Sequence, residues 1–507
     1  MAVVHFAALM TETWSKSWAP THIVLVALGV YVTIRAYQIS SDPLKSVPDA
    51  AFGARYTRLW YLWQLWRGDF QNTNIQLHKK YGKIVRTAPN QYSIDDPEAV
   101  KVIYGHTTRF TKGDWYLASA APQTLPTNLF AQQDQKKHAE LRRRFNNFYA
   151  MSTLVQYESH VNECISRFSE KLKEFSESKE HIDIAHWLQC YAFDVITKIT
   201  FDRRFGFLEN GEDVGGVIQS IDNFNLYATL MGVFPWLHAR LSVFGPLVGL
   251  KYIIGYVNQA LGERRQAKAQ GLDLSTVPDF VSKFFVNNEK DPEGFTMLHI
   301  FGGAATNVVA GTDTTAISLS SIVRQLATHP DVLTKLRAEI QDAKAAGKIS
   351  DPITFQESQG LTYFQAVIKE SLRVHPAAGL PMWRVVPEGG VIIAGRHFPS
   401  GTEVGINAWV AHRNEDVFGS NPELFRPERW LVDREQAAAM EHYFLSFGAG
   451  SRTCIGRHIS MLEISKLVPQ LFQQFNVLPA STWADIKELN RWFVKPKGLQ
   501  AVVELRE

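Results

Sequence analysis

The sequence predicts a mainly α-helical fold with small peripheral β-sheets, preceded by a single N-terminal transmembrane anchor. Three observations favour this fold class. Helical periodicity covers most of the chain, for example residues 154–175 and 322–345. Strand-like segments with turn glycines gather at residues 84–94 and 391–404. An apolar run near the N-terminus is followed at once by a proline-containing segment.

Composition limits the classes of function. The chain has 507 residues, of which 45% are apolar, so it can bury a substantial core. Lysine and arginine exceed aspartate and glutamate by only three charges. No strong field therefore marks the protein as a nucleic-acid binder. A small or lipid-like partner fits this composition better.

The predicted anchor covers residues 21–38 and follows an N-terminal tail of residues 1–20. Its apolar run stops at Arg35 and is somewhat short, since a helix needs about 20 residues to cross a bilayer. The alternative is a secretory signal peptide. That alternative is weaker because no clear small-x-small cleavage site follows and because Arg35 and Lys45 place positive charge on the C-terminal flank.

A hinge is predicted at residues 39–50, after the anchor. It holds Pro43 and Pro48 and few apolar residues, which indicates a stiff, extended linker. No further Pro/Gly/Ser tract, repeat or long charge block follows. Residues 51–507 are therefore expected to form one large domain.

The chain has three cysteines, which are too few for a disulfide framework and too scattered for a zinc site. This usage indicates a reducing compartment. Cys164 and Cys190 lie in helix-like apolar surroundings and are interpreted as small core residues. Only Cys454 has unusual neighbours.

Residues 447–456 read Phe-Gly-Ala-Gly-Ser-Arg-Thr-Cys-Ile-Gly and run into a helical pattern. Gly450 and Gly456 are expected to permit a tight turn and the close approach of a flat cofactor. Backbone N–H groups and the positive end of the following helix would stabilise a thiolate at Cys454. Arg452 is placed to pair with an anionic group of such a cofactor. A buried cysteine in a glycine-rich turn is the alternative that an isolated Cys-x-Gly would favour.

This stretch, beginning at Phe447, resembles the Phe-x-x-Gly-x-Arg-x-Cys-x-Gly signature of the cytochrome P450 family. A second segment, residues 310–315, reads Ala-Gly-Thr-Asp-Thr-Thr in a helix-like stretch of residues 297–328 and matches the family's oxygen-helix motif. The resemblance implies the P450 fold, haem b as the cofactor, Cys454 as the axial ligand of the haem iron, and residues 51–507 as the haem-binding catalytic domain.

Two residues of the second segment are expected to be catalytic. Dioxygen chemistry needs a hydroxyl to organise water and an acid to relay protons, and Thr314 and Asp313 fit these roles. The alternatives are structural. A helical threonine often bonds to a carbonyl one turn earlier, and an aspartate often lies on a solvated face.

Glu370 and Arg373 form a Glu-x-x-Arg pair three residues apart, followed by His375 and Pro376 where the helix must end. By itself such a pair indicates a solvated helix. Residues 425–430 resemble the family segment whose arginine, here Arg429, completes a buried Glu-Arg-Arg network. The predicted role of this network is structural: it would fix the loop before Cys454.

Further residues are expected to bind the haem propionates. The family's Trp-x-x-x-Arg motif appears here as His138 to Arg142, with histidine in place of tryptophan, and a histidine can still donate a hydrogen bond. Arg384 occupies another position from which the family often reaches a propionate. Arg143 and Arg144 are expected to be exposed, on a basic face suited to an acidic electron-donor protein.

The substrate pocket is expected to be lined by residues from several segments, although the aromatic ones could equally belong to the core. These candidates are Trp115, Phe301, Thr306, Ala310, Ala378 and Leu380.

Residues 129–152 look similar to filamentous-fungal members of the family related to pisatin demethylase. The resemblance implies a membrane-bound monooxygenase that inserts one atom of O2 into a hydrophobic small molecule of terpenoid, polyketide or alkaloid-like type. Electrons would come from a separate NADPH-dependent cytochrome P450 reductase, at the endoplasmic reticulum membrane, with a single-pass anchor and a cytosolic catalytic domain. Two alternatives stay open: a reductase-independent isomerase or dehydratase, and a non-enzymatic haem-binding sensor.

Overall fold

The computed structural model describes residues 42–120, 127–241, 250–483 and 486–506, together with seven residues between His22 and Thr33. The predicted tail and most of the predicted anchor lie outside the described residues. Within the described part of the chain, we find no helix with the length and apolar character that crossing a membrane requires.

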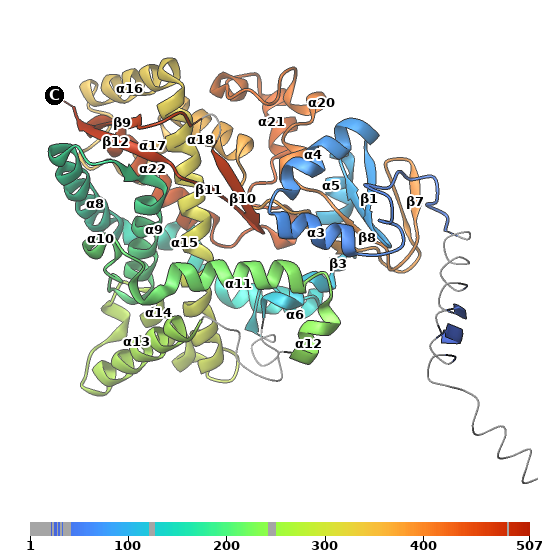
Figure 1. Ribbon diagram of the computed structural model, residues 1–507. Helices are drawn as coiled ribbons and strands as arrows, with labels where there is room; N and C mark the ends of the chain where they lie inside the picture. The colour runs from blue at the N-terminus through green and yellow to red at the C-terminus, as the bar shows by residue number, and fades with distance from the viewer. Residues whose placement is uncertain are drawn as a thin grey trace, which may run out of the picture.

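The central element is α15 (Met297–Thr328), a helix of 32 residues that runs through the middle of the molecule (Figure 1). Its bounds agree with the predicted helix-like stretch. It ends before Pro330, which starts α16 (Pro330–Ala345). The prediction of one continuous helix over residues 322–345 is therefore wrong, because proline lacks an N–H group and disfavours helical backbone at the preceding His329.

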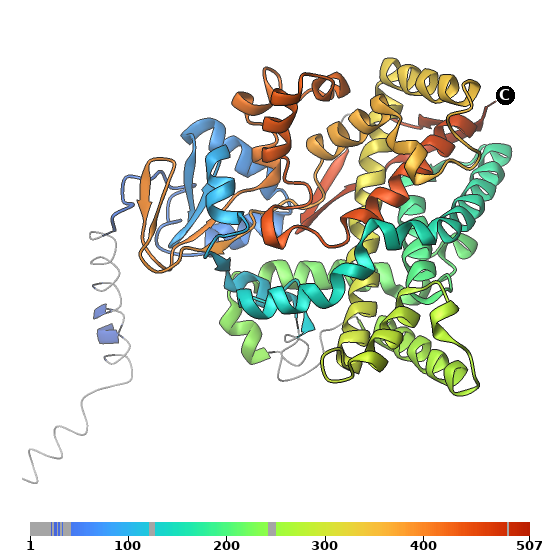
Figure 2. The ribbon, with the colours of Figure 1, turned by 180° about the vertical axis from the view of Figure 1, so that it is seen from behind.

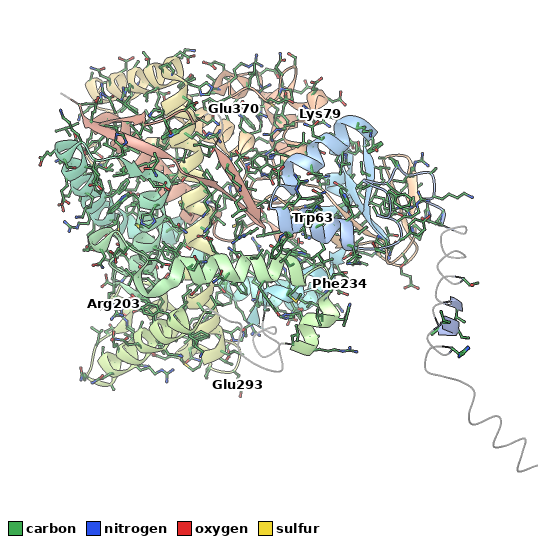
Figure 3. The ribbon with its side chains drawn as sticks, in the orientation of Figure 1. Trp63, Lys79, Arg203, Phe234, Glu293 and Glu370 are labelled. Carbon is green, nitrogen blue, oxygen red and sulfur yellow. The ribbon has the colours of Figure 1, made fainter. Side chains whose placement is uncertain are left out.

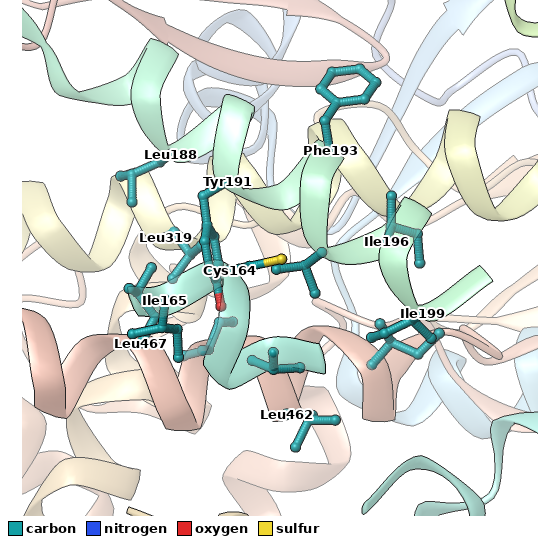
Figure 4. Packing of buried hydrophobic residues seen from close by; sticks show 14 of the residues in the cluster. Cys164, Ile165, Leu188, Tyr191, Phe193, Ile196, Ile199, Leu319, Leu462 and Leu467 are labelled. Atoms are coloured by element: carbon teal, nitrogen blue, oxygen red, sulfur yellow. The ribbon is translucent and has the colours of Figure 1, made fainter. Parts of the chain in front are cut away.

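Four helices form the main core with α15, and all but the first of them pack directly against it. They are α8 (Glu158–Ser178), α9 (Ile184–Phe201), α18 (Thr362–Val374) and α22 (Arg457–Gln474). Figure 4 shows Cys164, Tyr191 and Leu319 packed together in this core. Cys164 and Cys190 are fully buried, as predicted for core residues. Seen from behind in Figure 2, α22 passes close to α15.

The remaining helices complete a mainly helical molecule, as the sequence predicts. They are α3 (Leu59–Arg67), α4 (Phe70–Tyr81), α5 (Pro97–Tyr104), α6 (Gln135–Asn146), α7 (Met151–Leu154), α10 (Phe207–Asn210), α11 (Val217–Met231), α12 (Pro235–Leu241), α13 (Lys251–Ala269), α14 (Phe280–Lys290), α17 (Phe355–Gln359), α19 (Ala408–Ala411), α20 (Glu415–Phe418) and α21 (Arg434–Tyr443), with short 3-10 turns between several of them.

The described strands form four small sheets. The largest has the order β1-β2-β8-β5-β3, and the others pair β4-β12-β9, β10-β11 and β6-β7. Their bounds are β1 (Ile84–Ala88), β2 (Gln91–Ile94), β3 (Thr111–Lys112), β4 (Ile182–Asp183), β5 (Arg384–Val385), β6 (Val391–Ile393), β7 (Arg396–Phe398), β8 (Glu403–Gly405), β9 (Phe475–Pro479), β10 (Lys487–Arg491), β11 (Phe493–Lys497) and β12 (Gln500–Leu505).

Both predicted strand clusters are present, as β1–β2 and β6–β8. The C-terminal strands β9–β12 were not predicted. The β10–β11 hairpin also departs from the expected peripheral position, because β11 packs against the central helix α15 (Figure 1).

The described part of the predicted hinge is not an extended linker. Residues 43–46 form turns, and Leu44 and Val47 are buried in a core cluster. The buried guanidinium of Arg86 explains the difference. It forms an ion pair with Asp42 at 2.5 Å and donates a hydrogen bond to the Leu44 carbonyl at 2.8 Å, so the segment is held against the body.

Candidate active site

The Cys454 loop is a tight turn whose backbone needs glycine. Gly450 has φ +62°, and a Cβ atom there would lie 1.7 Å from the Tyr104 carbonyl oxygen. Gly448 also has positive φ, at +71°. The Cys454 N–H closes the turn by donating to the Phe447 carbonyl at 2.8 Å. Gly456 differs from the expectation: its φ is −80°, which any residue can adopt.

The Cys454 sulfur lies deep in the protein and yet has accessible surface. The residue is exposed, whereas burial is the largest cause that raises the pKa of its thiol. Backbone N–H groups of Gly456 and Arg457 donate to the sulfur, and these bonds and the charge of Arg142 oppose that rise in pKa. The residue therefore keeps accessible surface, and the N–H groups and the charge beside its sulfur favour the thiolate form that a metal ligand needs.

Four cations gather beside this loop: Lys112, Arg142, Arg384 and Arg452. Among the described residues, their hydrogen-bond partners are backbone carbonyls and one hydroxyl. Arg142 donates to the Thr453 carbonyl at 2.7 Å and Arg452 to the Gln133 carbonyl at 3.0 Å. Arg384 donates to the Trp383 carbonyl at 2.9 Å and the Tyr116 hydroxyl at 3.2 Å, and Lys112 donates to the Phe130 carbonyl.

Within the part of the chain that the structure describes, no carboxylate forms an ion pair with any of these four cations. Burial, followed by the charges of Arg384, Arg452 and Arg142, holds the pKa of Lys112 well below its ordinary value. Burial and the same cations lower the pKa of the buried His138 to about 3, so this imidazole is neutral. A pair of carboxylates, such as the propionates of haem, would complement this set of donors. The residues present therefore fit haem.

Lys112 was not among the residues predicted to bind the propionates. It stands on the two-residue strand β3, opposite Arg384 on β5 in the antiparallel register. A lone lysine in a short segment carries no motif, and only this pairing of distant segments brings the two cations together. Arg143 and Arg144 are exposed, as expected, although Arg144 also contacts the His299 ring nitrogen at 3.0 Å.

One face of α15 is open even though the helix is central. Thr306 and Ala310 are exposed and Thr314 is partly exposed, at spacings of four residues that place them on one side of the helix. The Thr314 hydroxyl donates to the Ala310 carbonyl at 2.8 Å, which is the alternative considered above. Next to it, the hydroxyls of Thr315 and Ser460 are 2.9 Å apart and join α15 to α22, the helix that follows Cys454.

Asp313 is fully buried and does not lie on a solvated face. Its Oδ1 accepts a hydrogen bond from Gln189 Nε2 of α9 at 2.6 Å, and its Oδ2 accepts one from Asn225 Nδ2 of α11 at 3.3 Å. Lys495 Nζ of β11 forms an ion pair with Oδ2 at 2.8 Å. The carboxylate is thus held by three elements on the helix side next to the open face.

The Glu-Arg-Arg network is present and buried (Figure 3 shows Glu370). Arg373 binds both oxygens of Glu370 at 2.8 Å, and Arg429 Nε lies 3.3 Å from Oε1. The Trp430 indole donates to Oε2 at 2.9 Å. The remaining Arg373 N–H groups donate to the His412, Pro422 and Leu424 carbonyls, so the network binds the segment that leads towards the Cys454 loop.

His412, at the end of α19, links the network to the loop and was not predicted. Its Nδ1 donates to the Arg373 carbonyl at 2.9 Å, and its Nε2 accepts from the Leu445 N–H at 2.8 Å. This arrangement requires the neutral ring with its proton on Nδ1. Burial and the charge of Arg373 lower the pKa of His412 to about 3. His412 lies in an Ala-His-Arg segment. No sequence pattern in this segment indicates that the histidine links the network to the Cys454 loop.

We expect His412 to make the protein less stable in acid. The unfolded chain binds a proton at the ordinary histidine pKa of 6.5, whereas the folded chain does so only near 3. The contribution of neutral His412 to the free energy of unfolding is therefore complete above pH 6.5. It is lost as the pH falls, at up to about 1.4 kcal/mol per pH unit. Unfolding by urea at several pH values measures this slope. His412→Gln should reduce it, and His397→Gln, which changes an exposed histidine, should not.

The pocket candidates divide into two groups. Thr306, Ala310 and the partly exposed Phe301 and Ala378 have accessible surface. Trp115 and Leu380 are buried in a core cluster, where the Trp115 ring lies 4.5 Å from the Trp492 ring and its indole donates to the Thr229 carbonyl. Trp115 therefore matches the alternative that the aromatic candidates belong to the core, and Leu380 is buried in the same cluster.

A cysteine loop with accessible surface, a cation cluster suited to propionates and an open central helix together fit a haem-thiolate enzyme. The chain matches the family model for Cytochrome P450 over residues 52–503. It is 38% identical over 472 residues to a cytochrome P450 monooxygenase of Aspergillus terreus, covering 90% of this chain and 94% of that protein. It is 37% identical over 493 residues to pisatin demethylase of Fusarium vanettenii, covering 96% and 93%.

A third relative, cytochrome P450 monooxygenase cicH of Emericella nidulans, is 35% identical over 446 residues, covering 87% of this chain and 89% of that protein. The chain belongs to the cytochrome P450 family. It is a P450 monooxygenase, and its family binds haem b. The resemblance seen in the sequence motifs is thereby confirmed.

Proposed function

We propose that this monooxygenase acts on a hydrophobic small molecule in fungal specialised metabolism, of terpenoid, polyketide or alkaloid-like type. It receives electrons from a separate NADPH-dependent cytochrome P450 reductase. The observation that carries the proposal is the accessible surface that the central helix α15 keeps at Thr306, Ala310 and Thr314, together with the accessible surface of Cys454, because a buried helix that keeps one face open offers a place for a small molecule. Its relatives from Aspergillus, Fusarium and Emericella support a fungal role.

The roles of the residues follow from their positions. When bound, haem supplies dioxygen chemistry, and a thiolate ligand donates electron density that favours O–O cleavage. Cys454 provides this ligand, with N–H groups of Gly456 and Arg457 directed at its sulfur. The four cations of the cluster would bind the two propionates: Lys112, Arg142, Arg384 and Arg452. The Thr314 hydroxyl organises water on the open face, and Asp313 holds and releases the proton at its carboxylate.

We also propose that the catalytic domain rests on the endoplasmic reticulum membrane, facing the cytosol, behind an N-terminal anchor. The support is a set of large apolar side chains exposed on α3 and α12. Trp63 and Trp66 of α3 are 57% and 62% exposed, and Trp236 of α12 is 58% exposed. Tryptophan is enriched at membrane interfaces, where an apolar ring with a polar edge is favoured. Figure 3 labels Trp63 on α3 and Phe234, which directly precedes α12.

The proposal is tested by product formation with the reductase, NADPH and isotopically labelled dioxygen. We expect one labelled oxygen atom per product molecule. Product that forms without dioxygen or reductase would favour an isomerase or dehydratase instead. A protein that binds haem and forms no product across a broad substrate panel would favour a sensor.

Asp313→Asn and Thr314→Ala should lower kcat on the order of 100-fold, because each removes a group that delivers or organises protons. Haem binding and substrate binding should be retained, since neither residue contacts the Cys454 loop or the cation cluster. The effect on kcat is measured as the rate of product formation at saturating substrate, together with the amount of NADPH consumed per product. Thr328→Ala, at the far end of α15, is the matched control, and equal kcat in all three variants would contradict the assigned roles.

A further inference from the structure

A cleft lies at the C-terminal end of α15, away from the Cys454 loop. Its volume is ≈ 610 Å³, within the range of sites that bind small molecules. Arg324 and Thr328 of α15 line it, and the other described walls come from the end of α18, from α19 and from β10. Arg324 follows Thr314 by ten residues, which is about 15 Å along a helix. The cleft is therefore distinct from the open face at Thr314.

Glu488 is the one acidic side chain among the described residues that line the cleft, and it is already paired. Its Oε1 lies 3.1 Å from Arg324 Nη1 and 3.5 Å from His375 Nδ1. Burial acts to raise the pKa of Glu488, but His375 and Arg324 lower it to about 2. The carboxylate is therefore ionised near neutral pH, and the charge of Arg324 is balanced by it.

Arg413 is a second cation on the cleft wall, and no described carboxylate forms an ion pair with it. Its Nη1 and Nη2 donate to backbone carbonyls at 3.0 and 3.1 Å. Burial, and then the charge of Arg373, lower the pKa of Arg413 to about 10, so the guanidinium is still charged near neutral pH. Glu488 and Glu423 oppose this fall from a distance, and each is paired with another cation. An anionic ligand would complement this arginine.

Two indole rings supply apolar surface to the same cleft. Trp409 and Trp483 both line it and are otherwise buried. The Trp409 N–H donates to the Pro376 carbonyl at 2.9 Å, and the Trp483 N–H donates to the Gln500 carbonyl at 3.0 Å. Since both polar edges are occupied, the indoles offer only ring carbon to a ligand. The Arg413 guanidinium lies over the Trp409 ring, 5.0 Å from its centre, so the cation and the aromatic surface adjoin.

We propose that this cleft is a second binding site, which takes a small planar aromatic carboxylate. The carboxylate pairs with Arg413, and the ring lies against Trp409 and Trp483. A neutral aromatic molecule would leave Arg413 without a counter-charge, and an aliphatic anion would cover less of the indole surface. The site does not depend on the proposed function, because it shares no residue with the Cys454 loop, the cation cluster or the open face of α15.

The first test measures the binding of 2-naphthoate to the haem-loaded protein by isothermal titration calorimetry. We expect saturable binding and a rise in Tm, since a ligand that binds only the folded chain stabilises it. The Soret band should not shift, because the cleft lies away from Cys454. The uncharged analogue 2-naphthamide should bind on the order of 10-fold more weakly, since it cannot form the charged pair with Arg413.

Variants then locate the bound probe. Arg413→Gln should weaken 2-naphthoate on the order of 10-fold and leave 2-naphthamide unchanged. Arg434→Gln is the matched control, because it removes an exposed arginine of α21 that does not line the cleft. If Arg413→Gln does not fold, Thr328→Trp carries the test. Thr328 is exposed and lines the cleft, so a large ring at this position should fill the cleft and abolish the binding of both probes.

Three results would overturn the proposal. One is the absence of saturable 2-naphthoate binding to the wild-type protein. Another is equal affinity for the acid and the amide, which would show that Arg413 does not select an anion. The last is a shifted Soret band together with wild-type affinity in Thr328→Trp, which would place the probe beside the haem instead of in the cleft.

Discussion

Replacing Cys454 with alanine is expected to abolish the strongly red-shifted Soret band that the reduced protein shows with carbon monoxide. The band requires a thiolate ligand, and Cys454 is exposed whereas Cys164 and Cys190 are buried. Alanine leaves the loop intact, because Gly448 and Gly450 supply its positive φ angles. The cation cluster is unchanged, so some haem should still bind through its propionates. Catalysis should be lost entirely.

The matched controls are Cys164→Ala and Cys190→Ala. Both cysteines are fully buried in the helical core, and burial raises the pKa of both thiols. These variants should keep the band and lose only a little stability, on the order of 1 kcal/mol. If the Cys454→Ala protein retains the red-shifted band, Cys454 is not the haem ligand and has only a structural role in the turn.

Replacing Glu370 with glutamine is expected to destabilise the protein by about 3–5 kcal/mol. The two carboxylate oxygens accept hydrogen bonds from Arg373, Arg429 and Trp430 and from the Arg426 N–H. A glutamine has one acceptor oxygen, and its NH2 group would face donors. Two arginines would also lose their buried counter-charge.

Urea unfolding and haem content measure the effect of Glu370→Gln, since the network holds the segment before the Cys454 loop. Glu441→Gln is the control. Glu441 is 43% exposed and pairs with Lys369 on the surface, so its loss should cost no more than about 1 kcal/mol. If the two variants unfold at the same urea concentration, the network does not stabilise the fold as argued.

The features that could be predicted from the sequence are those formed by residues close together in the chain. The bounds of α15 follow from its periodicity, although the break at Pro330 was overlooked in the stretch 322–345, and the Cys454 turn follows from its glycines. Glu370 and Arg373 lie on one helical face, so their pairing is also visible in the sequence. In each case the residues that act together are close in the chain or fixed by one element.

Long-range pairing accounts for what the sequence could not predict. Lys112 meets Arg384 only because β3 pairs with β5, and Lys495 meets Asp313 only because the hairpin packs on α15. Strands of two to five residues carry too little periodicity to be recognised. Gly456 shows a further limit, because a glycine in a motif can serve through its N–H group rather than through its φ angle.

The cation cluster also has a consequence for how the protein matures. Lys112, Arg142, Arg384 and Arg452 repel one another, and burial of Lys112 adds to the cost of bringing them together. An anionic prosthetic group relieves this repulsion only in the folded chain, so folding and cofactor uptake are thermodynamically linked. The last part of the chain to become rigid should be the one that holds the propionates. In a cell, the supply of haem would then set how much of the newly made polypeptide survives.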